Sequence, residues 1–312
     1  ELKNMIETCI YYYDITGGAF DITILPLLNL WSNDKYLFSM NSTYAFDLDN
    51  NTVSNEIKSG FENFEPSLYD LNETPALSLV DGGWEIKSSW QTYYLTNETN
   101  EIKVYTKFWY LPSTTQDVFI NEIKELVGSN KITIADDSIS LETGMSITLD
   151  GMAKGYAVDE AVKVLKAHGI AAGLVDAGGD IATFGMKPGN EKWITGLRNP
   201  QDTSESVMEF GLSDMAIATS GNYERYFDKN ATVGHIMDPA NGRSVSKCSS
   251  ATVITKNCTI ADILATSVFV KGTVDGIDLA NSLANVEAVV LGYDDPQETF
   301  TSSGLENFVI EN

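Results

Sequence analysis

Four short clusters of residues in this chain have side chains and spacing suited to chemistry. The first, residues 150–156 (DGMAKGY), lies where a predicted strand passes into a predicted helix and opens on Asp150 and Gly151. The free N–H groups at the start of a helix bind anionic phosphate, and the Lys154 ammonium would add a positive charge there. The same residues also fit a tight turn in which the glycines serve only the backbone geometry.

The second cluster, residues 176–180 (DAGGD), follows another predicted strand. Gly178 and Gly179 have no side chains, so a ligand can approach the backbone closely at the strand end, and Asp180 supplies a carboxylate. A plain turn without a ligand explains these residues equally well.

The third cluster, residues 234–239 (GHIMDP), contains one of the two histidines of the chain. His168 lies at the end of a predicted helix, where a structural interaction with the helix dipole is the favoured interpretation. His235 follows an apolar strand pattern and stands beside Asp238, a better place for a general base near neutral pH. An inert loop histidine is the competing interpretation.

The fourth cluster contains Asp262 and Thr266, four residues apart and therefore on one face of a predicted helix. A carboxylate, a hydroxyl and nearby carbonyl groups form the oxygen-only ligand set that Mg²⁺ prefers. Alternatively, Asp262 caps the helix and the Thr266 hydroxyl bonds back to the preceding turn. Together, the four clusters indicate a protein that binds a phosphorylated ligand with Mg²⁺.

The elements that must position these clusters begin with a predicted helix over residues 1–16, which ends at the Gly17-Gly18 pair. Residues 19–31 are apolar and interrupted by Pro26, which predicts a buried extended loop. Because residue 1 already lies within the helical pattern, we expect a processed or truncated N-terminus.

The second half of the chain alternates between strand and helix patterns. The clearest helix runs from Tyr156 to His168, and its predicted buried face contains Ala157, Ala161, Val164 and Leu165. The other predicted elements are a helix around 118–128, a helix from near Ala261, and strands near 131–135, 146–149, 171–177, 193–198, 215–219 and 250–255.

The stretch between these parts, residues 32–112, is rich in Asn, Ser, Thr and aromatic residues. Residues 90–95 and 101–111 are typical of two strands joined by a polar turn, and residues 44–54 suggest a second hairpin. We therefore predict three parts: an N-terminal helix with the start of a ligand site (1–31), a β-rich insertion (32–112) and an α/β portion (113–312).

Composition limits the class of protein. Hydrophobic residues make up 43% of the 312 residues, the usual share for a protein with a substantial core. The net charge of −24 argues against nucleic acid as a partner, because phosphate binding needs clustered Lys and Arg. The spacing of Cys9, Cys248 and Cys258 does not match a zinc site. We predict that all three are buried free thiols, with a disulfide between Cys248 and Cys258 as the alternative.

Taken in order, the clusters and the stretches around them resemble the ApbE family of FAD:protein FMN transferases. The similar stretches lie within residues 9–31 and roughly 110–300, about two thirds of the chain. They read TGGAFDITILPLLNLW, LDGMAKGYAVDEAVKVLKAHGI, GLVDAGGDIATFG, WITGLRNP, IATSGNYERYF, GHIMDPANGR and ADILATSVFVKG.

The resemblance implies an α/β (α+β) fold of the ApbE-like, T-fold-related kind, with mixed sheets, flanking helices and an inserted β-rich subdomain. It implies an enzyme that moves FMN from FAD to a threonine hydroxyl of an acceptor protein, releases AMP and depends on Mg²⁺. The acceptor would be a redox-complex subunit or another extracytoplasmic flavoprotein. Such enzymes usually work outside the cytoplasmic membrane, often as lipoproteins, which sets the expected location.

The resemblance also assigns residues. The implied metal ligands are Gly151 and Ala265 through backbone carbonyls, with Asp262 and Thr266. The implied catalytic residues are His235, as the base for the acceptor threonine, and Lys154. The positions implied to contact or line the FAD site are Ala19, Phe20, Asp21, Asp150, Lys154, Gly178, Gly179, Asp180, Thr219, Ser220, Tyr223 and Met237.

Two other functions remain open at this point. The same fold could act as an FAD pyrophosphatase that gives FMN and AMP because water replaces the acceptor threonine. From a different class, the chain could be a flavin-binding carrier without turnover. Family members usually carry a longer segment before the TGGAFD motif and a shorter link after it. These two departures of this chain from the family pattern concern its affinity for the cofactor and its choice of acceptor more than its metal site.

Overall fold

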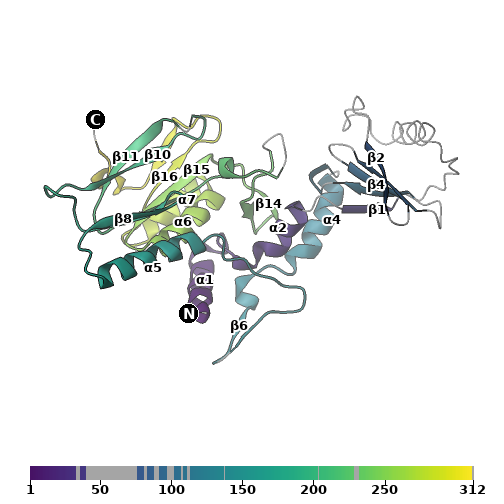
Figure 1. The fold of residues 1–312 in the computed structure, drawn as a ribbon, viewed down its shortest axis with the longest axis horizontal. Coiled ribbons are helices and arrows are strands. Elements are labelled where there is room, and N and C mark those ends of the chain that lie inside the picture. Colours follow the sequence, from purple (N-terminus) through teal and green to yellow (C-terminus); the bar gives the residue numbers. More distant parts are fainter. Residues whose placement is uncertain are drawn as a thin grey trace. The chain divides into compact units, whose positions relative to one another are not determined.

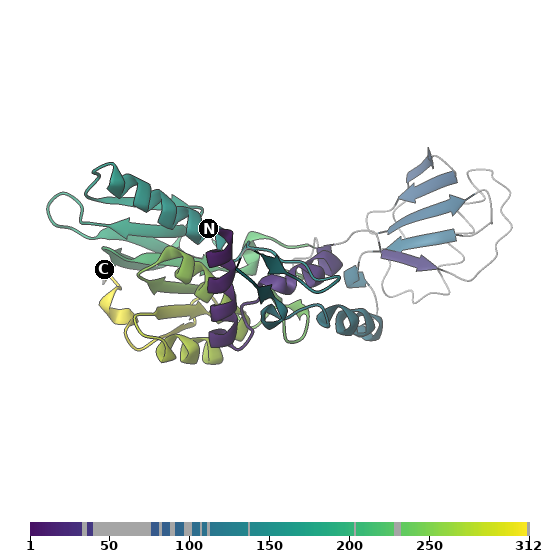
Figure 2. The same ribbon diagram turned by 90° about the horizontal axis from the view of Figure 1, so that it is seen from below.

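A computed structural model of the chain describes residues 1–32, 36–39, 76–80, 83–87, 91–96, 102–106, 108–110, 113–136, 138–202, 204–227 and 232–310. The chain divides into two compact units. The larger unit contains Glu1–Leu28 and Ile120–Asn312, and the smaller unit contains Asn29–Phe119. Figures 1 and 2 show the elements of each in two orientations.

The centre of the larger unit is a six-stranded sheet (Figure 1). Its strands, in spatial order, are β17 (Thr299–Thr301), β16 (Glu287–Leu291), β15 (Ser250–Thr255), β12 (Ala216–Ser220), β9 (Asp180–Phe184) and β8 (Gly173–Ala177). Every pairing in it is antiparallel, not mixed as the family resemblance implied. β8, β12 and β15 lie where strands are predicted.

Both faces of this sheet are covered. The helices α5 (Ala153–Ala167), α6 (Cys258–Lys271) and α7 (Thr273–Ser282) lie against one face. The antiparallel hairpin of β10 (Trp193–Arg198) and β11 (Ser206–Leu212) packs on the other. The result is a three-layered unit.

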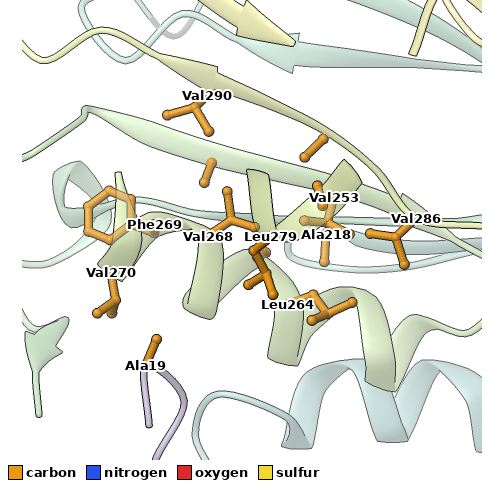
Figure 3. Packing of buried hydrophobic residues seen from close by; sticks show 14 of the residues in the cluster. Ala19, Ala218, Val253, Leu264, Val268, Phe269, Val270, Leu279, Val286 and Val290 are labelled. Atoms are coloured by element: carbon orange, nitrogen blue, oxygen red, sulfur yellow. The ribbon is translucent and has the colours of Figure 1, made fainter. Parts of the chain in front are cut away.

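The alternation of side chains along the strands explains how one sheet serves two cores. On β15, Val253 points into the cluster shared with α6 and α7, and its neighbour Ile254 points into the cluster under β10 and β11. Figure 3 shows Val253 and Val290 from the sheet facing Val268 of α6 and Leu279 of α7. All six residues of β15 are buried, and they are small or β-branched residues that pack well in a strand covered on both faces.

Helix α6 is the most deeply buried helix among the described elements. Leu264 packs toward the sheet cluster, and Ile263 packs into a different cluster with Ile6 of the N-terminal helix. A helix that is apolar on all sides is buried on all sides. It begins at Cys258, three residues before the predicted start, because the Asn257 side chain accepts a hydrogen bond from the Ile260 N–H at 3.0 Å.

The N-terminal helix α1 (Leu2–Thr16) confirms the prediction for residues 1–16 and ends at Gly17, whose φ of 64° is left-handed. The prediction of an extended loop over 19–31 is wrong. This segment forms a 3₁₀ helix (Ile22–Ile24) and then α2 (Leu25–Ser32). Pro26 lies in the first turn of α2, where a helix needs no N–H from it.

The predicted helix at Tyr156–His168 exists as α5, which begins three residues earlier, but its predicted buried face is wrong. Val164 is 56% exposed and Leu165 is also exposed. The buried side of α5 carries Gly155 and Val158, because these residues lie against α6 and the sheet. The spacing of the larger apolar side chains predicts a different face from the one that Gly155 brings against α6.

Short elements connect these parts. Helix α4 (Ser113–Lys124) overlaps the predicted helix around 118–128, and β6 (Thr133–Ile134) pairs with β7 (Ile139–Ser140). The strand predicted at 146–149 is wrong: these residues form no regular element, and the Thr148 N–H donates to the Ile22 carbonyl at 2.8 Å. The 3₁₀ helices Ser129–Lys131, Asn222–Glu224 and Leu305–Asn307 and the pair β13 (Met237–Asp238) and β14 (Arg243–Ser244) complete the described elements of the larger unit.

The smaller unit contains a five-stranded antiparallel sheet. Its order is β1 (Tyr36–Ser39), β5 (Ile102–Thr106), β4 (Gln91–Thr96), β3 (Gly83–Lys87) and β2 (Ala76–Val80). The predicted hairpin is present as β4 and β5, although its second strand ends at Thr106, before the 3₁₀ helix Phe108–Tyr110. The hairpin predicted at 44–54 lies outside the described residues, and the boundaries 32–112 stay a prediction.

Two further observations concern the residues that the structure describes. None of the described helices is long and apolar enough to cross a membrane. The three cysteines are buried and free, so the alternative of a Cys248–Cys258 disulfide is wrong.

Candidate functional site

The junction before α5, α6 and the segment after α1 meet at Gly151. A Cβ atom built on Gly151 would lie 3.1 Å from Cε2 of Phe20 and 3.5 Å from Oγ1 of Thr266. Glycine at this position therefore leaves a space beside the Thr266 hydroxyl that a larger residue would fill. Two of the predicted metal ligands, Gly151 and Thr266, are neighbours in the fold.

A second hydroxyl reaches the same place from the sheet. Ser220, the last residue of β12, has its Oγ 3.1 Å from Oγ1 of Thr266. The preceding residue, Thr219, points elsewhere and shares a hydrogen bond of 2.8 Å with Thr252 on β15. Of these two predicted residues, Ser220 is the one that contacts the Thr266 group.

Asp262 lies one helical turn before Thr266 and is buried. Its Oδ2 accepts a hydrogen bond of 3.1 Å from the N–H of Gly155, in the first turn of α5. The approach is close because Gly155 lacks a side chain: a Cβ there would lie 2.3 Å from the Cys258 carbonyl oxygen. Asp262 thus meets the positive end of the α5 dipole. The alternative role as the cap of its own helix is wrong, since Asn257 caps α6.

Asp180 supplies a second buried carboxylate beside Asp262. It is 1% exposed, and its Oδ2 lies 3.1 Å from the Nζ of Lys154, whose side chain is half-exposed. The Lys154 ammonium and the Asp262 carboxyl both interact with this carboxylate. A carboxylate offers about four acceptor sites, so Asp180 keeps capacity to interact with a cation as well.

The two carboxylates affect each other's ionisation. Burial, and then the charge of Asp180, raises the pKa of Asp262 to about 7. Burial also raises the pKa of Asp180, while the Lys154 ammonium opposes that shift. Two acidic groups held in a buried place at such a cost favour a cation that neutralises them.

The donor set suits a hard cation such as Mg²⁺. Within the described parts of the chain, no group of three or more His, Cys, Asp and Glu side chains is placed to hold a metal ion. The ligands that the resemblance implies, the Asp262 carboxylate, the Thr266 hydroxyl and backbone carbonyls, are oxygen atoms throughout. Ala265 has a methyl side chain without a donor atom, so it could contribute only its backbone carbonyl, and that side chain is buried in the core.

His235 is half-buried and is held by a backbone carbonyl. Both its N–H and its Nδ1 lie within hydrogen-bond distance of the Arg225 carbonyl oxygen, at 3.2 and 3.1 Å. A carbonyl only accepts hydrogen bonds, so Nδ1 carries a proton, and in the neutral imidazole with this tautomer Nε2 is the basic nitrogen. His168 instead caps the end of α5 through Nδ1, 2.9 Å from the Val164 carbonyl, consistent with a structural role.

The segment after α1 contributes differently from residue to residue. Ala19 packs in the same cluster as Ala265, and Phe20 packs in a cluster with Met152 and Ile263. The Asp21 carboxylate is already used: its Oδ1 accepts hydrogen bonds from the Thr23 N–H, the Thr23 hydroxyl and the Ser129 hydroxyl, at 2.8, 2.6 and 2.6 Å. These contacts give Asp21 a structural function in this turn.

The remaining predicted residues lie on neighbouring elements without a described contact to the Thr266 group. Gly178 and Gly179 form the turn before Asp180 with φ of 67° and 98°, and a Cβ on either would meet no atom. That turn is open to a ligand. The others are Asp150, exposed and bonded through its N–H to the Thr148 hydroxyl, Tyr223, in the 3₁₀ helix after Ser220, and Met237, buried in β13.

Sequence reasoning missed two residues that support this site. Asp159 on α5 accepts hydrogen bonds from the Cys258 and Thr259 N–H groups at 3.0 and 2.9 Å, and so caps α6 from outside. Asn222 holds the chain on either side of β13 and β14. Asp159 gives no signal in the sequence because its partners lie about one hundred residues away. Asn222 could have been found as a polar residue directly after the Ser220-Gly221 strand end.

Comparison with known proteins gives a consistent result. Residues 88–290 match the model of the ApbE family. The FAD:protein FMN transferase of Vibrio cholerae is 30% identical over 197 residues, which cover 62% of this chain and 59% of that protein. The FAD:protein FMN transferase of Treponema pallidum is 32% identical over 161 residues, covering 48% and 44%. The chain therefore spans about half the length of these curated relatives.

A solved structure shares the fold. The crystal structure of the ApbE protein from Thermotoga maritima superposes with a TM-score of 0.68 and 23% identity, covering 99% of this chain and 77% of that one. The predicted combination of sheets with flanking helices in an ApbE-like fold is confirmed.

Proposed function

This chain belongs to the ApbE family, and we propose from that premise that it is an enzyme that transfers FMN from FAD to a hydroxyl group of an acceptor protein. The names of its curated relatives support flavin transfer. Its own residues supply the reasons to expect turnover and not binding alone.

The observation that carries the proposal is the meeting of Gly151, Asp262 and Thr266 at the start of α5. Gly151 leaves space beside the Thr266 hydroxyl, and Asp262 lies one turn away against the Gly155 N–H. A pyrophosphate placed here would face a helix N-terminus and the Lys154 ammonium. A protein that only carried flavin would need neither the metal ligands Asp262 and Thr266 nor the base His235.

Mg²⁺ fits the oxygen donors of this place, and Asp262, Thr266 and the carbonyls of Gly151 and Ala265 would hold it. When bound, Mg²⁺ supplies charge neutralisation for the pyrophosphate. The raised pKa of Asp262 supports this assignment, because a cation would offset the cost of burying its charge beside Asp180.

In the proposed reaction, the acceptor threonine oxygen attacks the phosphorus atom of the FMN half of FAD. A new O–P bond forms, the bond from that phosphorus to the bridging oxygen breaks, and AMP leaves with the bridging oxygen. Lys154 and the N–H groups of the first turn of α5 would stabilise the charge that develops on the phosphate oxygens. No oxidation or reduction is involved.

His235 is the proposed general base. Its Nε2 would take the proton of the threonine hydroxyl as the oxygen attacks, and such a contribution is worth about 10²–10⁴-fold in rate. The Arg225 carbonyl supports this role because it favours the tautomer with the proton on Nδ1, in which Nε2 is the basic nitrogen. The acceptor would be a redox-complex subunit or another flavoprotein outside the cytoplasmic membrane.

The test is intact-mass analysis of an acceptor domain with a target threonine after incubation with this protein, FAD and MgCl₂. We expect a mass gain equal to one FMN phosphoryl adduct, which EDTA and Asp262→Ala both abolish. Asp294→Ala, a change of an exposed aspartate, is the matched control and should leave the adduct yield unchanged.

The other outcomes would replace the proposal. Conversion of FAD to free FMN and AMP with several acceptors and no adduct would identify an FAD pyrophosphatase. FAD that stays intact for hours with Mg²⁺ would identify a carrier. A normal yield from Asp262→Ala would show that the metal assignment is wrong.

A further inference from the structure

We propose that Asn222 is a positioning residue for His235: its buried carboxamide fixes the backbone around the histidine and so keeps the imidazole proton on Nδ1, against the Arg225 carbonyl. This inference rests on the proposed function, which gives His235 its role as base. The positioning itself is a property of the free protein and can be measured without turnover.

The carboxamide of Asn222 bridges the two segments that flank β13 and β14. Its Nδ2 donates to the Val245 carbonyl at 2.7 Å, and its Oδ1 accepts from the Ile236 N–H at 3.0 Å. The Val245 N–H in turn donates to the Ile236 carbonyl at 3.0 Å. Asn222 is 6% exposed, so water cannot readily replace these bonds.

The backbone of Asn222 reaches His235 by a second route. Its carbonyl accepts from the Arg225 N–H at 3.1 Å, which closes the 3₁₀ turn that ends at Arg225. The Arg225 carbonyl then accepts hydrogen bonds from the backbone N–H and from Nδ1 of His235. One residue thereby fixes the turn that presents the carbonyl and the chain directly after the histidine.

Gly234 makes the arrangement possible. A Cβ atom at this position would lie 2.0 Å from Cγ of Asn222, closer than any real contact. The Gly234 N–H also donates to the Ser244 hydroxyl at 2.8 Å. Asn222 thus fits into a space that exists only because the residue before His235 is a glycine.

The chemistry explains why this matters for a base. If the loop shifts, the Arg225 carbonyl no longer holds Nδ1, and the neutral imidazole divides between its two tautomers. In the wrong tautomer, Nε2 carries a proton and cannot accept one. A displacement of about 1 Å at a reacting group can itself lower a rate about 10²-fold.

The first experiment is a double-mutant cycle on the rate of FMN transfer. Asn222→Ala should lower kcat about 10- to 100-fold in the wild-type background. In the His235→Ala background, the same change should lower it less than about twofold, because the residue through which Asn222 acts is gone. Asn222→Asp keeps the shape but places an oxygen against the Val245 carbonyl, and should resemble Asn222→Ala.

Asn199→Ala is the matched control. Asn199 is a buried asparagine in the same unit whose Oδ1 accepts the Gln201 N–H at 2.9 Å. It should cost similar thermal stability and leave kcat within about twofold of wild type. An equal loss of kcat from Asn222→Ala in both histidine backgrounds would overturn the proposal.

A second experiment does not depend on activity. Nitrogen-15 NMR distinguishes the imidazole tautomers, and the chain has only two histidines, so His168 serves as an internal reference. We expect Nδ1–H for His235 in the wild type and a mixture of tautomers in Asn222→Ala, or in Gly234→Ala if the first variant does not fold. An unchanged tautomer and ring position in a folded variant would refute positioning, whereas normal transfer by His235→Ala would refute only the base assignment.

Discussion

Asp159 and Asp262 each cap the helix that carries the other. Asp159, on α5, accepts hydrogen bonds from the first N–H groups of α6, and Asp262, on α6, accepts one from Gly155 in the first turn of α5. The crossing of the two helices is therefore fixed by these three hydrogen bonds as well as by the close approach at Gly155. A substitution of Asp159 should therefore also shift the position of the candidate metal ligand Asp262.

The first prediction concerns this pair of caps. Asp159→Ala should lower the free energy of unfolding by about 1–2 kcal/mol, because two N–H groups of α6 lose their acceptor. Thermal and urea unfolding measure this. Asp275→Ala is the control, since Asp275 lies in the first turn of α7, where no side chain caps the helix, and should cost less than about 0.5 kcal/mol. Equal losses would show that the cap bonds contribute nothing.

The second prediction concerns the space at Gly151. Gly151→Ala should raise the FAD or Mg²⁺ concentration needed for half-maximal activity at least about tenfold, because a methyl group enters the space beside Thr266. The free energy of unfolding should change by less than about 1 kcal/mol. Isothermal titration and activity at varied Mg²⁺ provide the measurements.

Gly211→Ala is the matched control for Gly151→Ala. A Cβ at Gly211 would also meet its first neighbour at 3.1 Å, but that neighbour is the flexible Lys192 side chain, on the hairpin face of the sheet. Ligand binding by Gly211→Ala should match the wild type. Unchanged affinity in Gly151→Ala would place the ligand elsewhere.

The third prediction is a pH dependence of stability in the presence of EDTA. The pKa of Asp262 in the folded protein, about 7, lies above its ordinary value of 3.8 because of burial and the Asp180 charge. Below about pH 4 both states hold the proton, and above about pH 7 both have lost it. Between these values the unfolded chain ionises first, so this group's contribution to stability falls as the pH rises.

The measurement is urea unfolding of the wild type and Asp262→Asn at pH 5 and pH 8. The asparagine can still accept the Gly155 N–H but does not titrate. Since one pKa unit corresponds to about 1.4 kcal/mol, the variant should gain on the wild type by about 1 to 4 kcal/mol over this range. A constant difference between the two proteins would contradict the raised pKa.

The fourth prediction concerns the thiols. Burial raises the pKa of Cys9 and of Cys248 to about 12, and burial followed by the nearby carboxylates raises that of Cys258. Because the thiolate is the reactive form, none should react quickly with an alkylating reagent at pH 8 in the native protein. All three should react after unfolding in urea. Rapid native labelling of even one thiol, located by mass spectrometry, would contradict its burial.

The comparison of sequence and structure shows which features are encoded locally. The C-terminal end of α1 follows from the Gly17-Gly18 pair, and the strand at 250–255 follows from a run of small and β-branched residues. The buried face of α5 does not, because Gly155 determines it through contact with the Cys258 carbonyl. Hydrophobic periodicity predicts a buried face from large apolar side chains, whereas here a glycine makes the contact between α5 and α6.

The candidate site divides in the same way. Gly151, Asp262 and Thr266 come from motifs that can be read in the sequence, and the fold places Gly151 and Asp262 on either side of the α5 start. The interaction of Asp180 with Asp262 and Lys154 could not be predicted, because it depends on strand β9 lying beside α6. Asp21 shows the opposite case: it belongs to a recognisable motif, but two hydrogen bonds from Thr23 and one from the distant Ser129 occupy its Oδ1.

The hydrogen bonds around Asp21 have one more consequence: they allow the larger unit to be interrupted by the long segment Asn29–Phe119. The Gly128 N–H donates to the Thr23 hydroxyl at 2.6 Å although 105 positions separate the two residues, and Ser129 donates to Asp21 beside it. These bonds fasten the exit and re-entry points of the larger unit to each other. Loop-closure entropy grows by only about 0.6 kcal/mol per doubling of length, so closing this span instead of a ten-residue loop costs about 2 kcal/mol more. Residues 29–119 can therefore differ in length or sequence while these hydrogen bonds keep the two segments of the larger unit together.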